Sequence, residues 1–445
     1  MRVCIIGNGI AGINTAVALR QDGLSAGLPP VRAGGEDGNS GPSLAIDVFT
    51  SESLPFYSRV RLPEVLSGSA KPEDIAFYKP DWYEKRSISV HLSASVVSFD
   101  PSAKTLTLAD GRIERWDALV LATGASSNRP GIPGVESSGV FTMRTMEDVL
   151  AIRSHVLAHP SSASVIGGGL LGLEAACALK DAGAETVRVF ELFPRLLPRQ
   201  LDETGAALLA SRFAAMGIEV VCGAETARLE PGLIVLKDGR VFQSATTLLS
   251  MGVHSNIELA TAAGLEVKRG IVVDERMHTS APDVYAVGDC AEFGGIVWGI
   301  IPAALEQAPV AAKQIVSALS KSTKSTESTK STEATKSTEA PVYVQTVPKT
   351  ALKIAGIELM SVGKAVPTNE EASAGRYEIL MNVWSGGSRY EKYVLAPSAD
   401  PNLAANNATI LVGAILYGSR ANQSFVQAHI GKPADTADLA RLLDL

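Results

Sequence analysis

Two clusters of glycine are the residues whose type and spacing point most directly to chemistry. Each has the pattern G-x-G-x-x-G, and the members are Gly7, Gly9 and Gly12 in the first and Gly167, Gly169 and Gly172 in the second. Each cluster follows a short apolar run and precedes a helix-forming stretch, the order of strand, tight turn and helix that holds a dinucleotide. Unpaired N–H groups at the start of such a helix bind phosphate. The sequence therefore predicts two dinucleotide sites in one chain.

An acidic residue that accepts hydrogen bonds from the adenosine ribose is expected about 20 residues after the last glycine. Glu191 lies 19 residues after Gly172 (191 − 172), directly after the predicted strand 186–190. A carboxylate there repels a 2′-phosphate, which favours NADH over NADPH. Arg195 and Arg199 leave NADPH open, because a nearby arginine can accommodate that phosphate.

The corresponding carboxylate of the first unit comes late in the sequence. The second strand is predicted at 45–50, and the first carboxylate after it is Glu52, 40 residues beyond Gly12 (52 − 12). Residues 24–44 account for the excess, because they are rich in glycine and proline and poor in apolar residues. We expect them to form a mobile surface insertion.

Two further segments have residue types that suit a bound cofactor. Ala122, Thr123 and Gly124 follow the predicted buried strand 118–121, and such small residues let a cofactor lie against the turn. Arg59 and Arg61 follow the second strand and are candidates to pair with a pyrophosphate. A solvated loop is the alternative interpretation of the arginine segment.

Composition limits the classes of function. The chain has 445 residues, which suggests roughly two to four domains, and a net charge of −7, which gives no reason to expect nucleic-acid binding. The N-terminus has no leader pattern and no apolar run is long enough to cross a bilayer, so we expect a soluble, cytoplasmic protein. The cysteines are scattered without C-x-x-C or metal-ligand spacing, which predicts a reduced compartment and no metal site; they are Cys4, Cys177, Cys222 and Cys290.

Further patterns predict the remaining elements. Residues 81–117 are expected to form a small β-meander, and Pro309 is expected to kink or end a helix that begins at Pro302. Residues 320–340 are a near-repeat of Lys-Ser-Thr and Glu-Ser-Thr triplets with no large apolar residue, typical of a disordered linker. Strands followed by a final helix are predicted beyond it, at 351–354, 377–381, 391–395 and 410–416.

The order of GxGxxG, Tyr57-Ser58-Arg59 with Leu62, Ala122-Thr123-Gly124-Ala125 and the P-x-I-P-G pattern of residues 130–134 resembles the FAD-dependent pyridine nucleotide-disulfide oxidoreductase superfamily. Within it the chain looks most like rubredoxin and ferredoxin reductases and the NADH-binding part of assimilatory nitrite reductases. The resemblance implies an α/β fold with two Rossmann-like domains and a C-terminal α+β interface domain. The implied domains are FAD-binding (1–127 and 253–319), NAD-binding (128–252), a linker (320–340) and the interface domain (341–445).

The same resemblance implies FAD in the first unit and NADH in the second. It makes Asp289 the acceptor for a flavin ribitol hydroxyl and packs Gly252 against the nicotinamide nucleotide. It also directs the helix that starts at Pro302 toward the flavin pyrimidine, where the helix dipole stabilises the reduced ring.

Glu174 is the side chain expected near the hydride path, again from the resemblance. Relatives pair this glutamate with a lysine in the segment after Tyr57. The aligned position here is Glu64, so we expect two facing carboxylates that repel each other.

These expectations combine into an NADH oxidoreductase that passes electrons through flavin to a one-electron carrier such as rubredoxin or ferredoxin. Because such carriers are commonly acidic, a basic patch near the flavin edge is expected, with Arg59 and Arg61 as contributors. The alternatives are an NADH oxidase, the flavin component of a nitrite reductase system, and a non-enzymatic NADH-sensing flavoprotein. A homodimer is a further open possibility.

Overall fold

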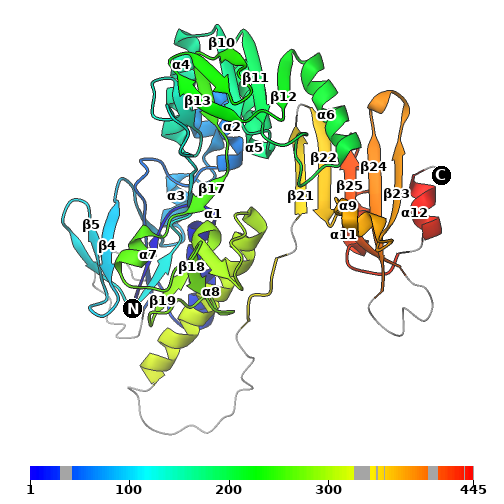
Figure 1. The fold of residues 1–445 in the computed structure, drawn as a ribbon. Helices are drawn as coiled ribbons and strands as arrows, with labels where there is room; N and C mark the ends of the chain where they lie inside the picture. The colour runs from blue at the N-terminus through cyan, green and yellow to red at the C-terminus, as the bar shows by residue number, and fades with distance from the viewer. Residues whose placement is uncertain are drawn as a thin grey trace. The chain divides into compact units, whose positions relative to one another are not determined.

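The computed structural model describes residues 1–30, 43–324, 341–346, 349–354, 356–398, 409–434 and 436–443. The chain divides into two compact units, and Figure 1 labels many of their helices and strands. Unit 1 comprises Met1–Arg59, Pro72–Ser126 and Val253–Thr346, and unit 2 comprises Val60–Lys71, Ser127–Gly252 and Val347–Leu445. Most of the predicted insertion and linker, residues 31–42 and 325–340, lies outside the described residues.

Unit 1 is built on a parallel five-stranded sheet in the order β19-β7-β1-β2-β3. Its strands are β1 (Arg2–Ile6), β2 (Ala45–Phe49), β3 (Ser89–His91), β7 (Ala118–Leu121) and β19 (Val284–Ala286). Ile6 is paired with Phe49 on one side and Leu121 on the other, so β1 lies inside the sheet. This position explains the unbroken apolar run of β1, because a central parallel strand is buried on both faces.

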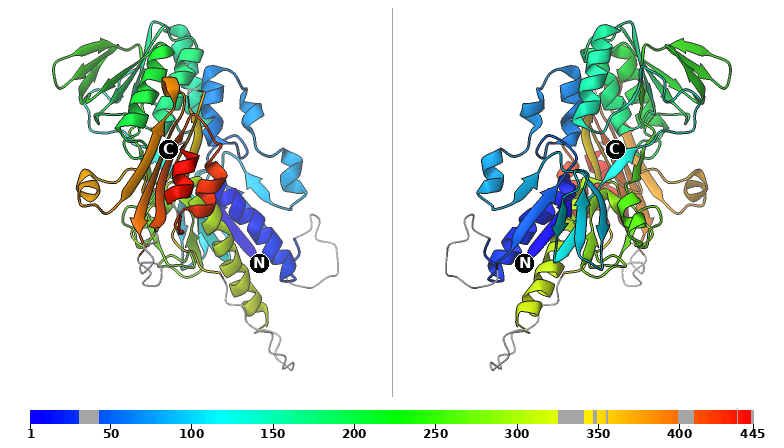
Figure 2. Two further views of the ribbon diagram at one scale, coloured as in Figure 1. Left: turned by 90° about the vertical axis from the view of Figure 1, so that its right-hand side faces the viewer. Right: turned by 90° about the vertical axis from the view of Figure 1, so that its left-hand side faces the viewer.

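Two long helices of unit 1, α1 (Ile10–Ser25) and α8 (Ile301–Lys324), pack against each other, as Figure 2 shows in blue and yellow-green. Pro302 is the second residue of α8 rather than the first. The prediction that Pro309 could end this helix is wrong, because α8 continues to Lys324, beyond the start of the predicted linker at residue 320. Ala311, Ala312 and Ile315 are fully buried, so packing outweighs the hydrogen bond that proline cannot make.

The predicted meander of residues 81–117 is only partly correct. An antiparallel sheet does form from β4 (Val96–Asp100), β5 (Thr105–Leu108) and β6 (Ile113–Arg115). The segment before it instead supplies α3 (Pro80–Glu84) and β3, whose residues pair in parallel with β2. Pairing with a distant strand decided this outcome, because the short run has no local pattern that distinguishes the two sheets.

The smaller elements of unit 1 connect these layers. They are η2 (Pro72–Ile75), β17 (Val253–Ser255), α7 (Glu258–Ala262), β18 (Ile271–Val273), η3 (Gly288–Cys290) and β20 (Ala291–Phe293). Two more, η1 (Arg59–Arg61) and β8 (Ala125–Ser127), begin in unit 1 and end in unit 2. β8 pairs with β17, and β18 pairs with β20.

Unit 2 repeats the same architecture with a second parallel sheet in the order β12-β11-β10-β16-β9. Its strands are β9 (Val140–Thr142), β10 (Ser162–Ile166), β11 (Thr186–Glu191), β12 (Ile218–Cys222) and β16 (Thr246–Leu249). The helices are α2 (Leu62–Ser67), α4 (Met146–Ala158), α5 (Leu170–Asp181) and α6 (Glu203–Ala215). A small antiparallel sheet contains β13 (Thr226–Glu230), β14 (Leu233–Leu236) and β15 (Val241–Gln243).

The C-terminal part of unit 2 is an antiparallel sheet in the order β21-β22-β25-β24-β23. The strands are β21 (Lys349–Ile354), β22 (Ile357–Gly363), β23 (Glu378–Val383), β24 (Tyr390–Pro397) and β25 (Thr409–Tyr417). The helical elements are α9 (Asn369–Ser373), η4 (Ser385–Gly387), α11 (Gln423–His429) and α12 (Thr436–Leu442). The predicted α/β class, with two parallel sheets and a C-terminal α+β part, is confirmed, and the assignment of cofactors to domains stays a prediction.

The structure also bears on the expectations about membrane spans and metal sites. Across the described ranges, no helix is both long and apolar enough to cross a membrane. The same residues contain no group of three or more His, Cys, Asp or Glu side chains arranged to hold a metal ion.

Candidate functional site

The first glycine turn joins β1 to α1 in a geometry that only glycine allows at two positions. Gly7 has φ +112°, and a Cβ atom there would lie 2.1 Å from the carbonyl oxygen of Ala122. A Cβ on Gly12 would lie 1.9 Å from the carbonyl oxygen of Gly7. Gly9 is different, because a Cβ there would meet no atom within 4 Å. The turn is therefore tightly packed from behind and open at Gly9, as the approach of a phosphate requires.

The second turn, between β10 and α5, has the same features. Gly167 has φ +119°, and its Cβ would lie 2.1 Å from the carbonyl oxygen of Ser250. A Cβ on Gly172 would lie 2.0 Å from the oxygen of Gly167, whereas one on Gly169 would meet nothing within 4 Å. Gly9 and Gly169 are the N-cap residues of α1 and α5, and neither helix has a side-chain cap. The first N–H groups of both helices suit an anion, so both turns fit a dinucleotide pyrophosphate.

Glu191 ends β11 beside the second turn and is 6% exposed. Its Oε2 accepts a hydrogen bond from the backbone N–H of Gly168 at 2.7 Å, and its Oε1 accepts one from Phe193 at 2.8 Å. Two backbone donors thus fix the carboxylate over the turn. Arg195, the candidate ligand for a 2′-phosphate, donates instead to the carbonyls of Leu201 and Pro198 at 3.1 and 3.3 Å.

Glu52, predicted to have the corresponding role in unit 1, belongs to a different cluster. Its carboxylate accepts hydrogen bonds from the Tyr57 hydroxyl and from Arg59, whose Nη2 lies 2.5 Å from Oε1. Arg59 is therefore paired with a carboxylate, and so is Arg61, whose Nη2 lies 2.7 Å from Glu64 Oε2. Neither guanidinium is an unpaired charge of the basic patch that was expected.

The segment that contains Ala122, Thr123 and Gly124 is anchored by Asn256, a residue that sequence reasoning missed. The Thr123 hydroxyl donates to the Asn256 carbonyl at 2.8 Å, and the Asn256 side chain donates to the Thr123 carbonyl at 2.9 Å. The backbone N–H of Asn256 also donates to the carbonyl of Gly124 at 3.0 Å. These reciprocal bonds hold the turn after β7, whose Ala122 carbonyl lies against Gly7.

The other predicted site residues lie at the ends of strands or helices. Asp289 is in η3, where its carbonyl accepts from the Ser255 hydroxyl at 2.7 Å. Gly252 follows β16 with φ +82°, and its carbonyl accepts from the N–H of Asn128 at 3.0 Å. Pro302 lies in the first turn of α8. Unit 1 thus contains Asp289 and Pro302, and unit 2 contains Gly252.

Glu174 lies on α5, next to α2, and makes no hydrogen bond or ion pair with the part of the chain that the structure describes. Burial raises the pKa of its carboxyl from 4.5 to about 7. Glu64 on α2 is held by Arg61, whose hydrogen bonds lower the pKa of that carboxyl. The expected repulsion between Glu64 and Glu174 does not account for the raised pKa, because desolvation alone produces it.

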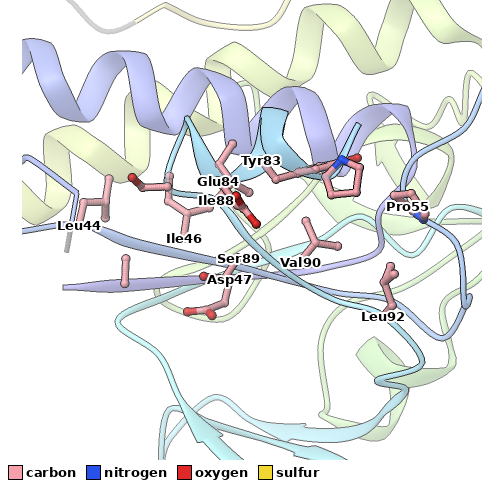
Figure 3. A pocket seen from close by; sticks show the side chains of 13 residues that line it. Leu44, Ile46, Asp47, Pro55, Tyr83, Glu84, Ile88, Ser89, Val90 and Leu92 are labelled. Carbon is pink, nitrogen blue, oxygen red and sulfur yellow. The ribbon is translucent and has the colours of Figure 1, made fainter. Parts of the chain in front are cut away.

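A cavity of about 800 Å³ lies along β2 and β3 of unit 1 (Figure 3). Its wall is mostly apolar, with Asp47 and Glu84 as its acidic members, and none of the site residues predicted from the sequence lines it. Asp47 is already bonded to Arg2 and His91, at 2.8 and 2.7 Å. Because its acidic Asp47 already has two partners and no predicted site residue lines it, we assign no chemistry to this cavity.

Comparison with known proteins agrees with this geometry. The model of the pyridine nucleotide-disulphide oxidoreductase family matches residues 1–314. The chain is 32% identical over 403 residues to the assimilatory nitrate reductase electron transfer subunit of Bacillus subtilis (strain 168), covering 90% of this chain and 45% of that protein. It is 33% identical over 327 residues to the rubredoxin-NAD(+) reductase of Pseudomonas putida, covering 71% and 80%. The chain spans about half the length of the Bacillus relatives that it matches.

Solved structures have the same fold. NADH:rubredoxin oxidoreductase from Clostridium acetobutylicum matches with a TM-score of 0.72 and 25% identity, covering 100% of this chain and 99% of that one. A ferredoxin reductase from Rhodopseudomonas palustris matches with a TM-score of 0.77 and 24% identity, covering 99% of both chains, and shows the fold alone. The matches confirm the predicted oxidoreductase class and its cofactors, FAD and a pyridine nucleotide. The chain belongs to the pyridine nucleotide-disulphide oxidoreductase family.

Proposed function

We propose that this protein is an FAD-dependent NADH oxidoreductase that passes electrons to a small one-electron carrier protein such as rubredoxin or a ferredoxin. The observation that carries the proposal is the pair of matched glycine turns, each packed behind and open at its middle glycine. The turn of unit 1 takes the FAD pyrophosphate and the turn of unit 2 takes that of NADH. FAD, when bound, supplies an acceptor for the hydride of NADH and a donor of single electrons.

The chain's own residues bind and orient the two dinucleotides. Asp289, Pro302 and the Asn256-anchored turn after β7 belong to the proposed flavin side, and Gly252 and Glu174 belong to the nicotinamide side. Glu174 is the one side chain on the nicotinamide side for which we propose a direct contact near the hydride path. With a pKa of about 7 this carboxyl is half protonated near neutrality, so it can donate a hydrogen bond to a carboxamide.

A protein carrier is favoured because the thiols do not form a dithiol. None of the four cysteines, all in the described ranges, is in a disulfide: Cys4 and Cys290 are buried, and Cys177 and Cys222 are half-buried. Burial raises the pKa of the Cys4 thiol, which makes it a poor nucleophile. Relatives named as rubredoxin-NAD(+) reductase and NADH-rubredoxin oxidoreductase, at 33% and 30% identity, support the same carrier class.

NADH is proposed over NADPH because the Glu191 carboxylate is fixed at the second turn by the N–H groups of Gly168 and Phe193. A 2′-phosphate would meet this charge in a largely buried position. Arg195 could compensate only by giving up its own backbone acceptors.

The test uses the purified full chain, loaded with FAD, under anaerobic conditions. We expect NADH to bleach the flavin much faster than NADPH does, and rubredoxin or ferredoxin to raise NADH turnover above the oxygen background. Turnover with the carrier should fall as ionic strength rises if acidic carriers meet a basic surface. A chain that binds no FAD refutes the proposal, and equal rates with the two nucleotides refute the role of Glu191.

Two alternatives have relatives that favour them. The NADH oxidase of Methanocaldococcus jannaschii is 33% identical over 338 residues, so oxygen is the second candidate acceptor. The Bacillus subtilis nitrite reductase aligns with 99% of this chain over 48% of its own length, which favours a component of a larger reductase. NADH consumption with oxygen that no carrier accelerates would select the oxidase, whereas turnover only with a nitrate- or nitrite-reducing partner would select the component.

The five-stranded C-terminal sheet is proposed as the interface domain, and a homodimer is its expected consequence. Light scattering of the purified chain at several concentrations tests this. A monomer at all of them would leave the sheet without that role.

A further inference from the structure

The two dinucleotide units can be matched residue by residue through their backbone hydrogen bonds. Gly7 N–H donates to Phe49 at 2.8 Å, as Gly167 N–H donates to Phe190 at 2.8 Å. On the far side of the strand, Ala94 N–H donates to Thr50 at 2.8 Å, as Ala224 N–H donates to Glu191 at 2.9 Å. In each unit the first bond comes from the first glycine of the turn and the second from the loop after the neighbouring strand, and their two acceptors are consecutive residues. Thr50 is therefore the counterpart of Glu191.

A third pair of bonds indicates that Glu52 is not the counterpart of Glu191. Ser93 N–H donates to the carbonyl of Glu52 at 3.0 Å, as Gly223 N–H donates to the carbonyl of Phe193 at 3.0 Å. Glu52 therefore corresponds to Phe193, two residues beyond the ribose position. Consistently, the Thr50 hydroxyl accepts from the N–H of Glu52 at 3.3 Å, as Glu191 accepts from Phe193.

The turns differ at one more matched position, where Asn8 in unit 1 corresponds to Gly168 in unit 2. A Cβ atom on Gly168 would lie 2.9 Å from Oε2 and 3.0 Å from Cβ of Glu191. A side chain in the turn and a glutamate on the strand therefore compete for the same space. Unit 2 combines glycine with glutamate, and unit 1 combines asparagine with the smaller threonine.

The Asn8 carboxamide is buried without its hydrogen bonds being satisfied. Asn8 is 9% exposed, and neither Nδ2 nor Oδ1 makes a hydrogen bond of acceptable geometry to the residues that the structure describes. The carboxamide lies near the hydroxyl of Tyr83, which accepts from the N–H of Phe56 at 3.2 Å. A buried amide without partners costs about 1–3 kcal/mol, which a bound ligand can recover.

We propose that Asn8 and Thr50 together bind the ribose hydroxyls of the FAD adenosine, in the place that a carboxylate occupies in unit 2. Asn8 offers both an acceptor and a donor, and Thr50 offers a hydroxyl, so the pair can satisfy a vicinal diol without charge. This inference rests on the proposed binding of FAD to unit 1.

Single substitutions of the full chain, stripped of flavin and titrated with FAD, test the inference. We expect Asn8→Ala and Thr50→Val each to raise the Kd for FAD about tenfold, which equals ~1.4 kcal/mol. The melting temperature of flavin-free Asn8→Ala should stay equal to or above that of the wild type, because an unsatisfied buried amide has been removed. FMN, which has no adenosine, should bind both variants as it binds the wild type.

A reciprocal exchange supplies the sharper test. Thr50→Glu alone should weaken FAD binding, because its side chain meets Asn8, whereas Asn8→Gly with Thr50→Glu should restore affinity by recreating the combination of unit 2. Glu191→Thr is the matched control, which should change affinity for NADH and leave that for FAD unaltered.

The outcomes separate the two proposals. If the wild type takes up no FAD, the proposed function fails and this inference fails with it. If the wild type binds FAD but Asn8→Ala and Thr50→Val bind it equally well, only the inference is overturned. It is also overturned if the double variant binds no better than Thr50→Glu, or if Asn8→Ala lowers the melting temperature and weakens FMN and FAD alike.

Discussion

Replacing Glu174 by glutamine tests whether burial or charge repulsion controls the carboxyl on α5. The pKa of Glu174 rises from 4.5 to about 7, and the cause is burial. The folded protein therefore holds a proton that the unfolded chain releases between these values, so stability decreases as pH rises through this window. Above it, the ionised carboxylate costs about 3 kcal/mol, because each tenfold change in proton affinity is worth ~1.4 kcal/mol.

Glutamine keeps the shape and removes the charge. Near pH 8.5 we expect Glu174→Gln to be more stable than the wild type by up to about 3 kcal/mol, and near pH 4.5 the two should agree within about 0.5 kcal/mol. For a unit of this size the gain corresponds to roughly 6–12 °C in melting temperature. Thermal unfolding of both proteins, in the same cofactor state, over about pH 4.5 to 9 measures it.

Glu64→Gln is the matched control, since it removes the second carboxylate that sequence comparison placed opposite Glu174. Glu64 is paired with Arg61, so this change should leave the pH dependence associated with Glu174 in place. The reasoning is refuted if Glu64→Gln abolishes that dependence, or if Glu174→Gln unfolds with the same pH profile as the wild type.

Three other substitutions have expected outcomes. Gly7→Ala should prevent stable folding of unit 1 and abolish FAD retention, because its Cβ would lie 2.1 Å from a backbone oxygen at φ +112°. Circular dichroism measures the folding and flavin absorbance measures the retention. A natively folded, yellow variant would contradict the packing argument. Glu191→Gln should lower the selectivity for NADH over NADPH by about tenfold or more, since a neutral amide does not repel the 2′-phosphate. The ratio of kcat/KM for the two nucleotides measures this selectivity, and an unchanged ratio would show that the charge is irrelevant. Asp202→Asn keeps the N-cap of α6 but should destabilise the folded protein by about 3 kcal/mol, because Lys392, which is 6% exposed, loses the carboxylate that lies 2.9 Å away. A loss below about 0.5 kcal/mol in denaturant unfolding would show that the pair contributes little.

Much of the fold followed from the glycine spacing. Once β1 and β10 each led through G-x-G-x-x-G into a helix, two parallel sheets were the expected frame, and Glu191 could be placed by counting from Gly172. Both predictions depend on local geometry: a tight turn needs glycine, and a fixed helix length sets where the next strand ends. Glu191 indeed ends β11 and contacts the turn.

Counting gives no fixed position where an insertion separates the strand from its turn. Residues 24–44 removed the fixed spacing, so the first carboxylate after the strand, Glu52, was predicted at the ribose position, where our proposal instead places Thr50. Comparing the two fingerprints position by position would have shown a signal, because Asn8 stands where the second has Gly168. The proposal of Thr50 depends on the register of β1, β2 and the segment after β3, which joins residues far apart in sequence.

The sequence by itself determined the residue types: two glycine turns, one well-spaced carboxylate and no dithiol motif. Tertiary structure decided what those residues face, because pairing and burial depend on neighbours that no local spacing specifies. Burial raises the pKa of Glu174, and Arg61 pairs with the charge of Glu64. Asn256, more than a hundred residues away from Thr123 in the sequence, holds the turn that contains Thr123 by hydrogen bonds. Proximity in the folded chain, and the removal of water that accompanies it, sets the charge state and the partners of each group.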